Sequence, residues 1–253
     1  MAGACGRMGT LVIENVLNAD DMKLVLALDV VRVGEPVCEG VVVQDAAEIS
    51  ELLSSAKPDV LIDFTRADAA VKNVGAAALS GVSAVVGTTG FSHEQRAQLE
   101  EFVDDRVPCI ISPNFSIGVN AFFRIVESAS RLLSGYDVEI VEAHHRNKQD
   151  APSGTAMRLA HIISDVLGEC EFVYGRKGMA SRGDEIGIHA VRAGDIVGDH
   201  TVIFAGNGDR IELTHRAHSR NTFASGAVAA ARWIVSQPAG MHTMDEFLSS
   251  LTG

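Results

Sequence analysis

Short apolar runs without strict polar alternation recur through the first half of the chain. They are rich in Val, Ile and Leu, which is typical of strands buried on both faces of a sheet. We predict strands at 23–29, 59–64, 82–87 and 107–111, separated by helices at 7–18, 47–56, 67–79 and 92–104. Ser92, followed by Gln95 three positions on, resembles a capping box. Strands that alternate with helices indicate a parallel sheet covered by helices on both faces.

The second half of the chain has a different pattern. We predict helices at 117–134, 155–167 and 222–236, a strand at 136–143, and three consecutive strands within IGIHAVRA, DIVGDHTVIFA and DRIELTH. The polar, glycine-rich residues 168–185 predict a mobile loop. Strands without intervening helices indicate a smaller α+β domain with an open mixed sheet. The predicted fold class is therefore α/β, with a largely parallel Rossmann-type domain followed by an α+β domain.

Composition narrows the function classes. The chain has 253 residues, 47% of them hydrophobic, which is enough for two domains. The formal net charge of −12 disfavours nucleic acid and anionic membranes as partners. The four cysteines are widely spaced and indicate neither disulfides nor a zinc site. The histidines lack metal-ligand spacing, so we predict no metal. No apolar run reaches the ~18–20 residues of a membrane span, and no secretory signal is evident, so we expect a cytoplasmic protein.

A glycine-rich stretch opens the chain. Residues 3–9 read GACGRMG, with Gly3, Gly6 and Gly9 at GxxGxxG spacing before a helical pattern. Such a turn lets backbone amides approach a pyrophosphate at a helix N-terminus. Asp29 follows Gly9 by twenty positions, where dinucleotide-binding folds place an acid for the adenosine ribose. A plain glycine-rich turn is the alternative, but the helix, the acid and the repeated βα units favour dinucleotide binding.

One expected element is almost absent. Only Met1 and Ala2 precede Gly3, although a central strand normally leads into such a loop. We expect the corresponding slot of the sheet to be empty and neighbouring backbone groups to be unpaired. The sequence therefore predicts a first domain that lacks its first strand, with a cost to stability and cofactor affinity.

A second cluster of polar groups lies in the middle of the chain. Residues 142–156 read EAHHRNKQDAPSGTA, in which two histidines, an arginine and a lysine precede a turn and a helix start. On an acidic protein, this local cluster favours a small anionic ligand held at one place. Free amides at the helix start add to that preference. Structural or exposed histidines are the alternative interpretation.

Both clusters belong to a wider resemblance. The chain resembles the dihydrodipicolinate reductase family, also called 4-hydroxy-tetrahydrodipicolinate reductases, over essentially its whole length. The matching stretches are GACGRMG (3–9), DFTR (63–66), VVGTTGF (85–91), SPNFSIGVN (112–120), EAHHRNKQDAPSGTA (142–156), VRAGDIVGDHTVIF (191–204) and HRAHSRNTFASGA (215–227). The HHxxKxDAPSGTA string is the most specific of them.

The resemblance implies an activity and an organisation. The expected reaction is NAD(P)H-dependent reduction of 4-hydroxy-tetrahydrodipicolinate to tetrahydrodipicolinate with loss of water, on the diaminopimelate route to lysine. The expected domains are 1–115 for the dinucleotide, 116–220 for substrate binding and oligomerisation, and a helical segment 221–253 that returns to the first domain. The expected assembly is a homotetramer, and the expected partner is a small dicarboxylate.

The resemblance also assigns residues. It implies catalytic roles for His144 and Lys148, and substrate contacts for His145, Gly154 and Thr155. Lys148 either donates a proton or only stabilises negative charge. The implied cofactor-binding residues are Gly3, Ala4, Cys5, Gly6, Arg7, Met8, Asp29, Gly87, Thr88, Thr89, Ser112, Pro113, Asn114 and Phe115. Thr88 and Thr89 alternatively cap the following helix, and Arg220 and Phe223 either approach the substrate or only pack.

Cofactor choice and activity have open alternatives. Asp29 is followed by Val30, where some NADPH-using members of the family carry an arginine, so NADH is favoured. Dual use would place Arg32 or Arg66 near a 2′-phosphate. The alternatives to the reductase are a dehydrogenase of another small carboxylate and, if the lead strand is truly lost, a non-catalytic nucleotide-binding protein.

Overall fold

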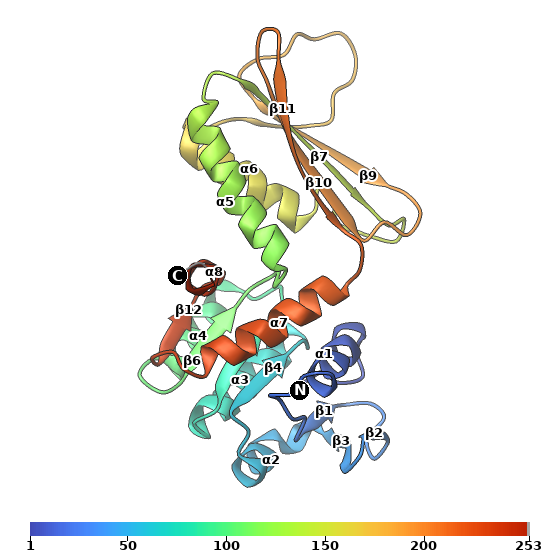
Figure 1. Ribbon diagram of the computed structural model, residues 1–253, viewed down its shortest axis with the longest axis vertical. Helices are drawn as coiled ribbons and strands as arrows, with labels where there is room; N and C mark the ends of the chain where they lie inside the picture. Colours follow the sequence, from blue (N-terminus) through green and yellow to red (C-terminus); the bar gives the residue numbers. More distant parts are fainter. Residues whose placement is uncertain (252–253) are drawn as a thin grey trace. The chain divides into compact units, whose positions relative to one another are not determined.

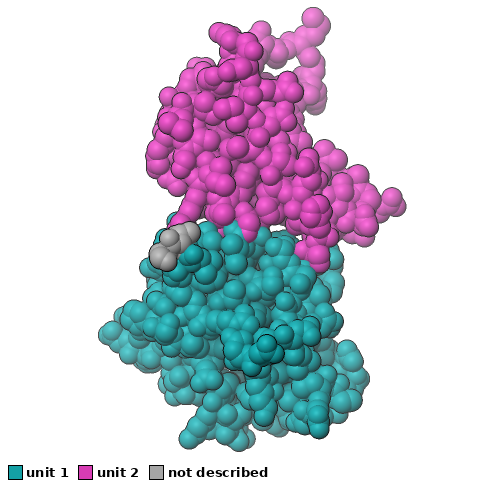
Figure 2. All heavy atoms as spheres, in the orientation of Figure 1, with its two compact units in different colours: residues 1–117, 220–253 teal, residues 118–219 magenta. Residues whose placement is uncertain are grey.

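The chain folds into two compact units. The structure, a computed structural model, describes residues 1–251 (Figure 1). The first unit contains Met1–Ile117 and the described residues from Arg220 onward, and the second contains Gly118–Ser219; they are coloured teal and magenta in Figure 2. None of the described helices is both long enough and apolar enough to cross a bilayer.

The first unit contains two small sheets and confirms the predicted parallel α/β pattern. A four-stranded parallel sheet has the order β12-β6-β5-β4, and a three-stranded sheet has the order β1-β3-β2. The strands are β1 (Ala27–Asp29), β2 (Pro36–Cys38), β3 (Val41–Asp45), β4 (Val60–Asp63), β5 (Ser83–Val86), β6 (Pro108–Ile111) and β12 (Gly240–His242). The helices are α1 (Arg7–Leu17), α2 (Ile49–Ala56), α3 (Ala67–Leu79), α4 (His93–Val103), α7 (Asn221–Ile234) and α8 (Met244–Ser250).

A single residue joins these two sheets. Ala2 forms parallel bridges to Leu28 of β1 and to Asp63 of β4. Its amide donates to Ile62 O at 2.9 Å, and its carbonyl accepts from the Phe64 amide at 3.1 Å. Ala2 thus occupies the central strand position on its own. The strand predicted at 23–29 is too long, since residues 23–26 form no strand and β1 begins at Ala27.

Local sequence explains several boundaries in the first unit. Ser92 and Gln95 form the predicted capping box, with Ser92 Oγ accepting from the Gln95 amide at 3.2 Å, so α4 begins where expected. In α7, small residues permit close packing. A Cβ added at Gly226 would lie 1.9 Å from Phe115 O, so only glycine fits there. Buried alanines of α7 join α1 residues in one hydrophobic core.

The second unit is a mixed five-stranded sheet with helices on one face. The strand order is β11-β10-β7-β9-β8, where β7 pairs in parallel with β9 and antiparallel with β10. The strands are β7 (Asp137–His144), β8 (Phe172–Tyr174), β9 (Ile186–Arg192), β10 (Gly198–Ala205) and β11 (Arg210–Ala217). The helices α5 (Ile117–Leu132) and α6 (Gly154–Leu167) supply apolar side chains to the core on that face (Figure 1).

The segment predicted as a loop at 168–185 contains strand β8. Arg182, near the end of this segment, binds to β7: its guanidinium donates hydrogen bonds to Asp137 Oδ1 at 2.9 Å and to Val138 O at 3.1 Å. Arg176 adds an ion pair to Glu139 at 3.1 Å. These contacts join charged residues that are far apart in the sequence, so the local composition of residues 168–185 did not predict them.

Candidate active site

The glycine-rich loop lies where the two sheets of the first unit meet. It follows Ala2 at the carboxyl ends of β1 and β4, and α1 begins directly after Gly6. A crevice at the carboxyl ends of parallel strands is the usual ligand position in an open α/β sheet. The first-turn amides of a helix have no acceptor within the helix and favour an anion. The predicted residues Gly3 to Met8 are therefore brought together at a helix N-terminus.

The glycines of this loop are required by close contacts. Gly3 has φ +77°, and a Cβ there would lie 2.6 Å from Phe64 O. A Cβ at Gly9 would lie 2.0 Å from Gly3 O, and one at Gly87 would meet the Phe64 ring at 2.1 Å. At these three glycines the backbone therefore packs too closely against neighbouring protein atoms to leave room for a side chain. Such a loop fits the pyrophosphate of a dinucleotide.

Asp29 is held against the same loop. Its Oδ2 accepts a hydrogen bond from the Cys5 amide at 2.8 Å, and its Oδ1 accepts from the Val30 amide at 2.8 Å. Burial and then the neighbouring Asp29 charge raise the pKa of the Cys5 thiol. Arg32 lies on the exposed loop that follows and is paired with Glu35 at 2.8 Å. The acid predicted for the ribose therefore lies beside the predicted phosphate loop.

The remaining predicted cofactor residues lie after β5 and β6. Thr88 is buried and donates to Asp63 Oδ1 at 2.8 Å, whereas Thr89 is exposed. Ser112 Oγ donates to Asn114 O at 2.9 Å, Phe115 is buried, and Pro113 is exposed. Thr88, Ser112 and Phe115 thus make contacts within the protein that shape the loops. Ser92, rather than either threonine, supplies the side-chain cap of α4.

In the second unit, β7 carries the predicted catalytic histidine at its carboxyl end. Successive side chains of a strand alternate between faces, so Val138, Ile140, Glu142 and His144 share the face that the helices cover. His144 Nδ1 lies 2.7 Å from Glu142 Oε2. The histidine predicted from the loop sequence is therefore anchored by a carboxylate two positions earlier.

Glu142 is completely buried, and three groups bind it. The Arg192 guanidinium forms a bidentate pair with both carboxylate oxygens at 2.7 Å. The Ser153 amide donates to Oε1 at 2.9 Å. Burial alone would raise the pKa of Glu142, but the bonds from His144 and Arg192 outweigh it and lower this pKa to about 2. The carboxylate is therefore charged at neutral pH.

A second imidazole lies beside His144. The His200 ring centroid is 5.1 Å from that of His144, and its Nε2 lies 3.0 Å from Ser153 Oγ. Burial first, and then the charge of His144, lower the pKa of His200 to about 3, so this ring is neutral. Within residues 1–251, its buried Nδ1 has no hydrogen-bond partner. Gly198 lies against the His144 ring. A Cβ at this position would come within 3.0 Å of His144 Nε2, so glycine leaves room for the imidazole.

The loop that follows β7 leads into the start of α6. Lys148 Nζ pairs with Asp150 at 2.8 Å, and Arg192 also donates to Asp150 O at 2.6 Å. Ser153 caps α6, with its Oγ accepting from the Ala156 amide at 3.2 Å. A Cβ added at Gly154 would meet no protein atom within 4 Å, so packing does not explain this glycine. The first-turn amides of Gly154 and Thr155 point from a capped helix start, which suits a carboxylate.

Sequence reasoning missed three members of this site: Glu142, Arg192 and His200. One signal was available: Glu142 lies in the strand predicted at 136–143 and His144 directly follows it, so the period of two places both side chains on one face if the strand continues by one residue. A carboxylate on an otherwise apolar face needs a partner. Arg192 and His200 come from other strands, and only the register of β9 and β10 against β7 places them there.

Comparison with known proteins connects both units to one family. The family model described as "Dihydrodipicolinate reductase, N-terminus" matches residues 1–115, and "Dihydrodipicolinate reductase, C-terminus" matches residues 118–248. The chain is 53% identical to the 4-hydroxy-tetrahydrodipicolinate reductase of Methanosarcina barkeri over 97% of each chain. It is 49% identical to the protein of the same name in Methanocaldococcus jannaschii, over 98% of this chain and 96% of that one.

A solved structure agrees with this assignment. The dipicolinate-bound dihydrodipicolinate reductase of Paenisporosarcina sp. TG-14 superimposes with a TM-score of 0.81 at 29% identity, covering 96% of this chain and 95% of that one. The fold class predicted from the sequence is thereby confirmed. Family models across both units, close relatives and a shared fold lead to one conclusion: the chain belongs to the dihydrodipicolinate reductase family.

Proposed function

We propose that this protein reduces 4-hydroxy-tetrahydrodipicolinate to tetrahydrodipicolinate with loss of water, using NADH or NADPH, on the diaminopimelate route to lysine. The observation that carries the proposal is the end of β7. There His144 is held by a buried carboxylate, and the same carboxylate accepts from the amide of Ser153, the residue that caps α6. A proton donor and an anion-binding helix start are the groups that reduction of a cyclic dicarboxylate requires.

The first unit holds the cofactor in this proposal. The amides that follow Gly6 bind the pyrophosphate, and Asp29 binds the adenosine ribose. Gly87, Thr89 and the residues from Ser112 to Phe115 lie after neighbouring strands and line the nicotinamide side. When bound, the reduced dinucleotide supplies the hydride.

His144 is the proposed proton donor. Its Nδ1 is engaged with Glu142, so Nε2 is the nitrogen left to give a proton to a ligand. The Glu142 carboxylate fixes the orientation of the ring, as a buried carboxylate does for the histidine of a catalytic triad. His200 stays neutral and so adds no competing charge. We predict that His144→Ala lowers turnover by ~10²-fold or more while NADH binding survives.

Lys148 and the α6 start are the proposed anion-binding groups. The first-turn amides of Gly154 and Thr155 bind one carboxylate, and His145 contributes to the substrate contacts. Lys148 stabilises developing negative charge, a role that needs its charge and not its proton. Lys148→Arg distinguishes the two roles, because arginine keeps the charge but does not give up a proton. Retained turnover in this variant supports charge stabilisation, and a loss as large as in Lys148→Ala supports proton donation.

The reaction is tested by a coupled assay. The cyclic substrate is generated in place by its upstream synthase, and oxidation of the dinucleotide is followed at equal concentrations of NADH and NADPH. Oxidation that depends on the synthase product supports the proposal. Oxidation with simple 2-oxo acids alone would overturn it in favour of another dehydrogenase. Dinucleotide binding without any turnover would favour a non-catalytic nucleotide-binding protein.

We further propose a preference for NADH. The Asp29 carboxylate lies beside the phosphate loop, and its negative charge opposes a 2′-phosphate. Arg32, the nearby cation, is already paired with Glu35. Asp29→Ala should therefore weaken NADH binding more than NADPH binding. Equal binding of NADH by the variant and the parent chain would remove Asp29 from the ribose site.

A homotetramer is the proposed assembly. The helices of the second unit cover one face of its sheet, and residues such as Val141 and Ile203 lie half-buried on the other face. A sheet face without a covering layer is a natural surface for self-association. Sedimentation velocity distinguishes a tetramer from a monomer at micromolar concentration.

A further inference from the structure

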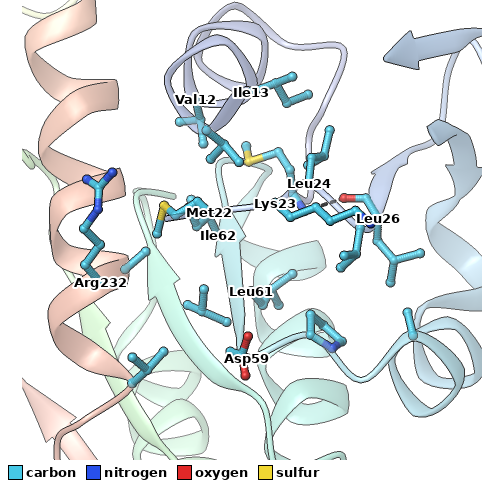
Figure 3. Close-up of a pocket in the computed structure, with 18 of the residues that line it drawn as sticks. Val12, Ile13, Met22, Lys23, Leu24, Leu26, Asp59, Leu61, Ile62 and Arg232 are labelled. Carbon is cyan, nitrogen blue, oxygen red and sulfur yellow. Dashed lines mark hydrogen bonds between the residues drawn. The ribbon is translucent and has the colours of Figure 1, made fainter. Parts of the chain in front are cut away.

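A buried cavity and a buried imidazole both lie outside the proposed reaction. The cavity, in the first unit, has a volume of about 860 Å³ and is lined by residues that include Leu24 and Leu61 (Figure 3). Asp21 and Arg232, two of its charged residues, are paired with each other at 2.7 Å, so their charges are satisfied within the protein. The imidazole is that of His200 in the second unit. This ring contacts the proposed site, yet the reaction as described gives it no task.

His200 is placed by the register of β10. It lies opposite Glu142 of β7, and the residue is only 4% exposed. Its Nε2 lies 3.0 Å from Oγ of Ser153, the residue that caps α6. Its ring centroid lies 5.1 Å from that of His144, in an edge-to-face arrangement. His200 therefore contacts the helix cap by a hydrogen bond and the proposed proton donor by ring packing.

Ser153 joins His200 to two other parts of the site. Its amide donates to Glu142 Oε1 at 2.9 Å, which ties the cap to the carboxylate that holds His144. Its Oγ accepts from the Ala156 amide at 3.2 Å, which fixes the first turn of α6. His200 therefore bonds to the same oxygen that holds the first turn of the helix.

The direction of the His200 bond follows from burial. With its pKa lowered to about 3 by burial, the ring is neutral and carries a single N–H. Within residues 1–251, the buried Nδ1 has no hydrogen-bond partner. A proton on Nδ1 would leave a buried N–H without an acceptor, which is rare in folded proteins, whereas a proton on Nε2 is donated to Ser153 Oγ. A serine oxygen has two lone pairs, so it accepts from both His200 and the Ala156 amide.

We propose that His200 is a positioning residue, which holds Ser153 Oγ in the rotamer that caps α6 and thereby aligns the amides of Gly154 and Thr155 for a substrate carboxylate. This role rests on the proposed function, in which those amides bind the carboxylate. Because the effect passes through the helix start and not through His144, it changes substrate affinity more than turnover. Support of the His144 ring by packing would instead lower turnover at unchanged affinity.

Two variants of the full chain separate the hydrogen bond from the packing of the ring. His200→Leu keeps an apolar side chain without the donor, and His200→Gln places an amide N–H where Nε2 stands. Thr201→Val is the matched control, because it removes a hydroxyl contact to Thr214 at 3.0 Å on the opposite face of β10. The measurements are KM and kcat in the coupled assay and hydrogen exchange of the Ala156 amide. A third measurement is the dissociation constant of dipicolinate, the ligand named for the Paenisporosarcina enzyme, with NADH present.

We expect His200→Leu to raise KM and the dipicolinate dissociation constant by ~10-fold, the effect of one hydrogen bond, while kcat stays within about threefold of the parent chain. Exchange of the Ala156 amide should quicken by at least ~5-fold. His200→Gln should recover most of each effect, and Thr201→Val should change none of them. When Ser153 is already alanine, His200→Leu should add less than about twofold, because the contact through which it acts is gone.

A lower kcat at unchanged KM, or no change in any measurement, would overturn the role of His200 at the helix cap. A parent chain that binds no dipicolinate would count against the proposed function, and exchange of the Ala156 amide would still decide the role of His200. If His200→Leu does not fold, His200→Asn takes its place under the same criteria, since its shorter amide does not reach Ser153.

Discussion

Among residues 1–251, each unit contains one fully buried carboxylate side chain, and the two accept hydrogen bonds from different kinds of donor. Asp63, at the end of β4, is bound by neutral groups: the Thr65 amide and hydroxyl, the Thr88 hydroxyl and the Asn73 amide, all within 3.0 Å. Glu142, near the end of β7, is bound by the Arg192 guanidinium, the His144 ring and the Ser153 amide. Both side chains have 0% exposure, so burial alone does not distinguish them.

The donors show what each carboxylate does. Neutral donors on Asp63 connect the loops after β4 and β5, and none of them changes charge near neutral pH. The carboxylate therefore fixes the shape of those loops. The donors on Glu142 include the ring of His144, so this carboxylate orients a proposed proton donor. The chemistry of the partners, more than the burial of the acid, separates a structural carboxylate from one that supports catalysis.

The largest expected effect is that of Glu142→Gln. It leaves the partly buried Arg192 guanidinium without its counter-charge and removes the carboxylate oxygen that holds the His144 ring in place. We expect turnover to fall by ~10²-fold and the free energy of unfolding to fall by roughly 3–5 kcal/mol. Steady-state kinetics and urea unfolding measure the two effects.

Glu139→Gln is the matched control for that variant. Glu139 also binds a histidine and two arginines, but it lies on the opposite face of β7 with its side chain 22% exposed. We expect its turnover to stay within about twofold of the parent chain. Equal losses in both variants would show that any broken ion pair on β7 impairs the enzyme, and the contrast between the two carboxylates would fail.

The next largest effect is a loss of folding stability at lower pH, which comes from the buried Met1 amino group and is moderated by the charge of Asp63. Burial lowers the pKa of the Met1 amino group to about 6, partly offset by the Asp63 charge. As the pH falls from 8 to 6, the unfolded chain gains a proton that the folded chain does not, so stability falls. The contribution of Met1 should total roughly 2–3 kcal/mol and be complete near pH 6, and His200, whose pKa is lowered to about 3, adds a further loss of stability below about pH 6.5. Urea unfolding at half-unit pH steps measures it, and a version extended before Met1 should show no such step.

Asp63→Asn should act on stability alone. The new amide faces the Asn73 amide, and one of the buried hydrogen bonds is lost or inverted. We expect a cost of roughly 1–3 kcal/mol in unfolding free energy, with turnover of the folded protein within about twofold of the parent. A drop in turnover as large as that of Glu142→Gln would give Asp63 a catalytic role and remove the distinction.

The smallest expected effect is that of Thr88→Val, which removes one donor to Asp63 at almost constant volume. We expect a loss of about 1 kcal/mol in unfolding free energy and an unchanged dissociation constant for NADH. Isothermal titration with NADH provides the measurement. A weaker affinity at unchanged stability would assign Thr88 to the cofactor site and not to the loop structure.

Local sequence predicted much of the fold, and long-range pairing explains the rest. Apolar periodicity located helix α3 and strands β4 to β6, and Ser92 with Gln95 located the start of α4. The same reasoning extended a strand back to residue 23, because periodicity does not reveal which residues of an apolar run find a pairing partner. Strands β2, β3 and β12 were not predicted, since they are short and depend on neighbours for pairing.

The candidate site was predictable only in part. The loop with His144, Lys148 and Gly154 is continuous in sequence, so its motif was visible as a unit. Arg192 and His200 come from β9 and β10, where each residue is unremarkable in its local context. The strand register aligns His144 with Arg192 and Glu142 with His200, and that register is a property of the folded sheet.

Cys5, at the centre of the phosphate loop, has a consequence for tolerance of oxidants. Its thiol pKa is raised by burial and by Asp29, which binds the Cys5 amide. The thiolate is the form that peroxide and alkylating reagents attack, so the fraction of reactive sulfur is small at neutral pH. We therefore infer that Asp29, the carboxylate proposed to bind a ribose, also protects the loop from chemical damage. Faster iodoacetamide labelling of Cys5 in Asp29→Ala would support this protective role, and an unchanged labelling rate would contradict it.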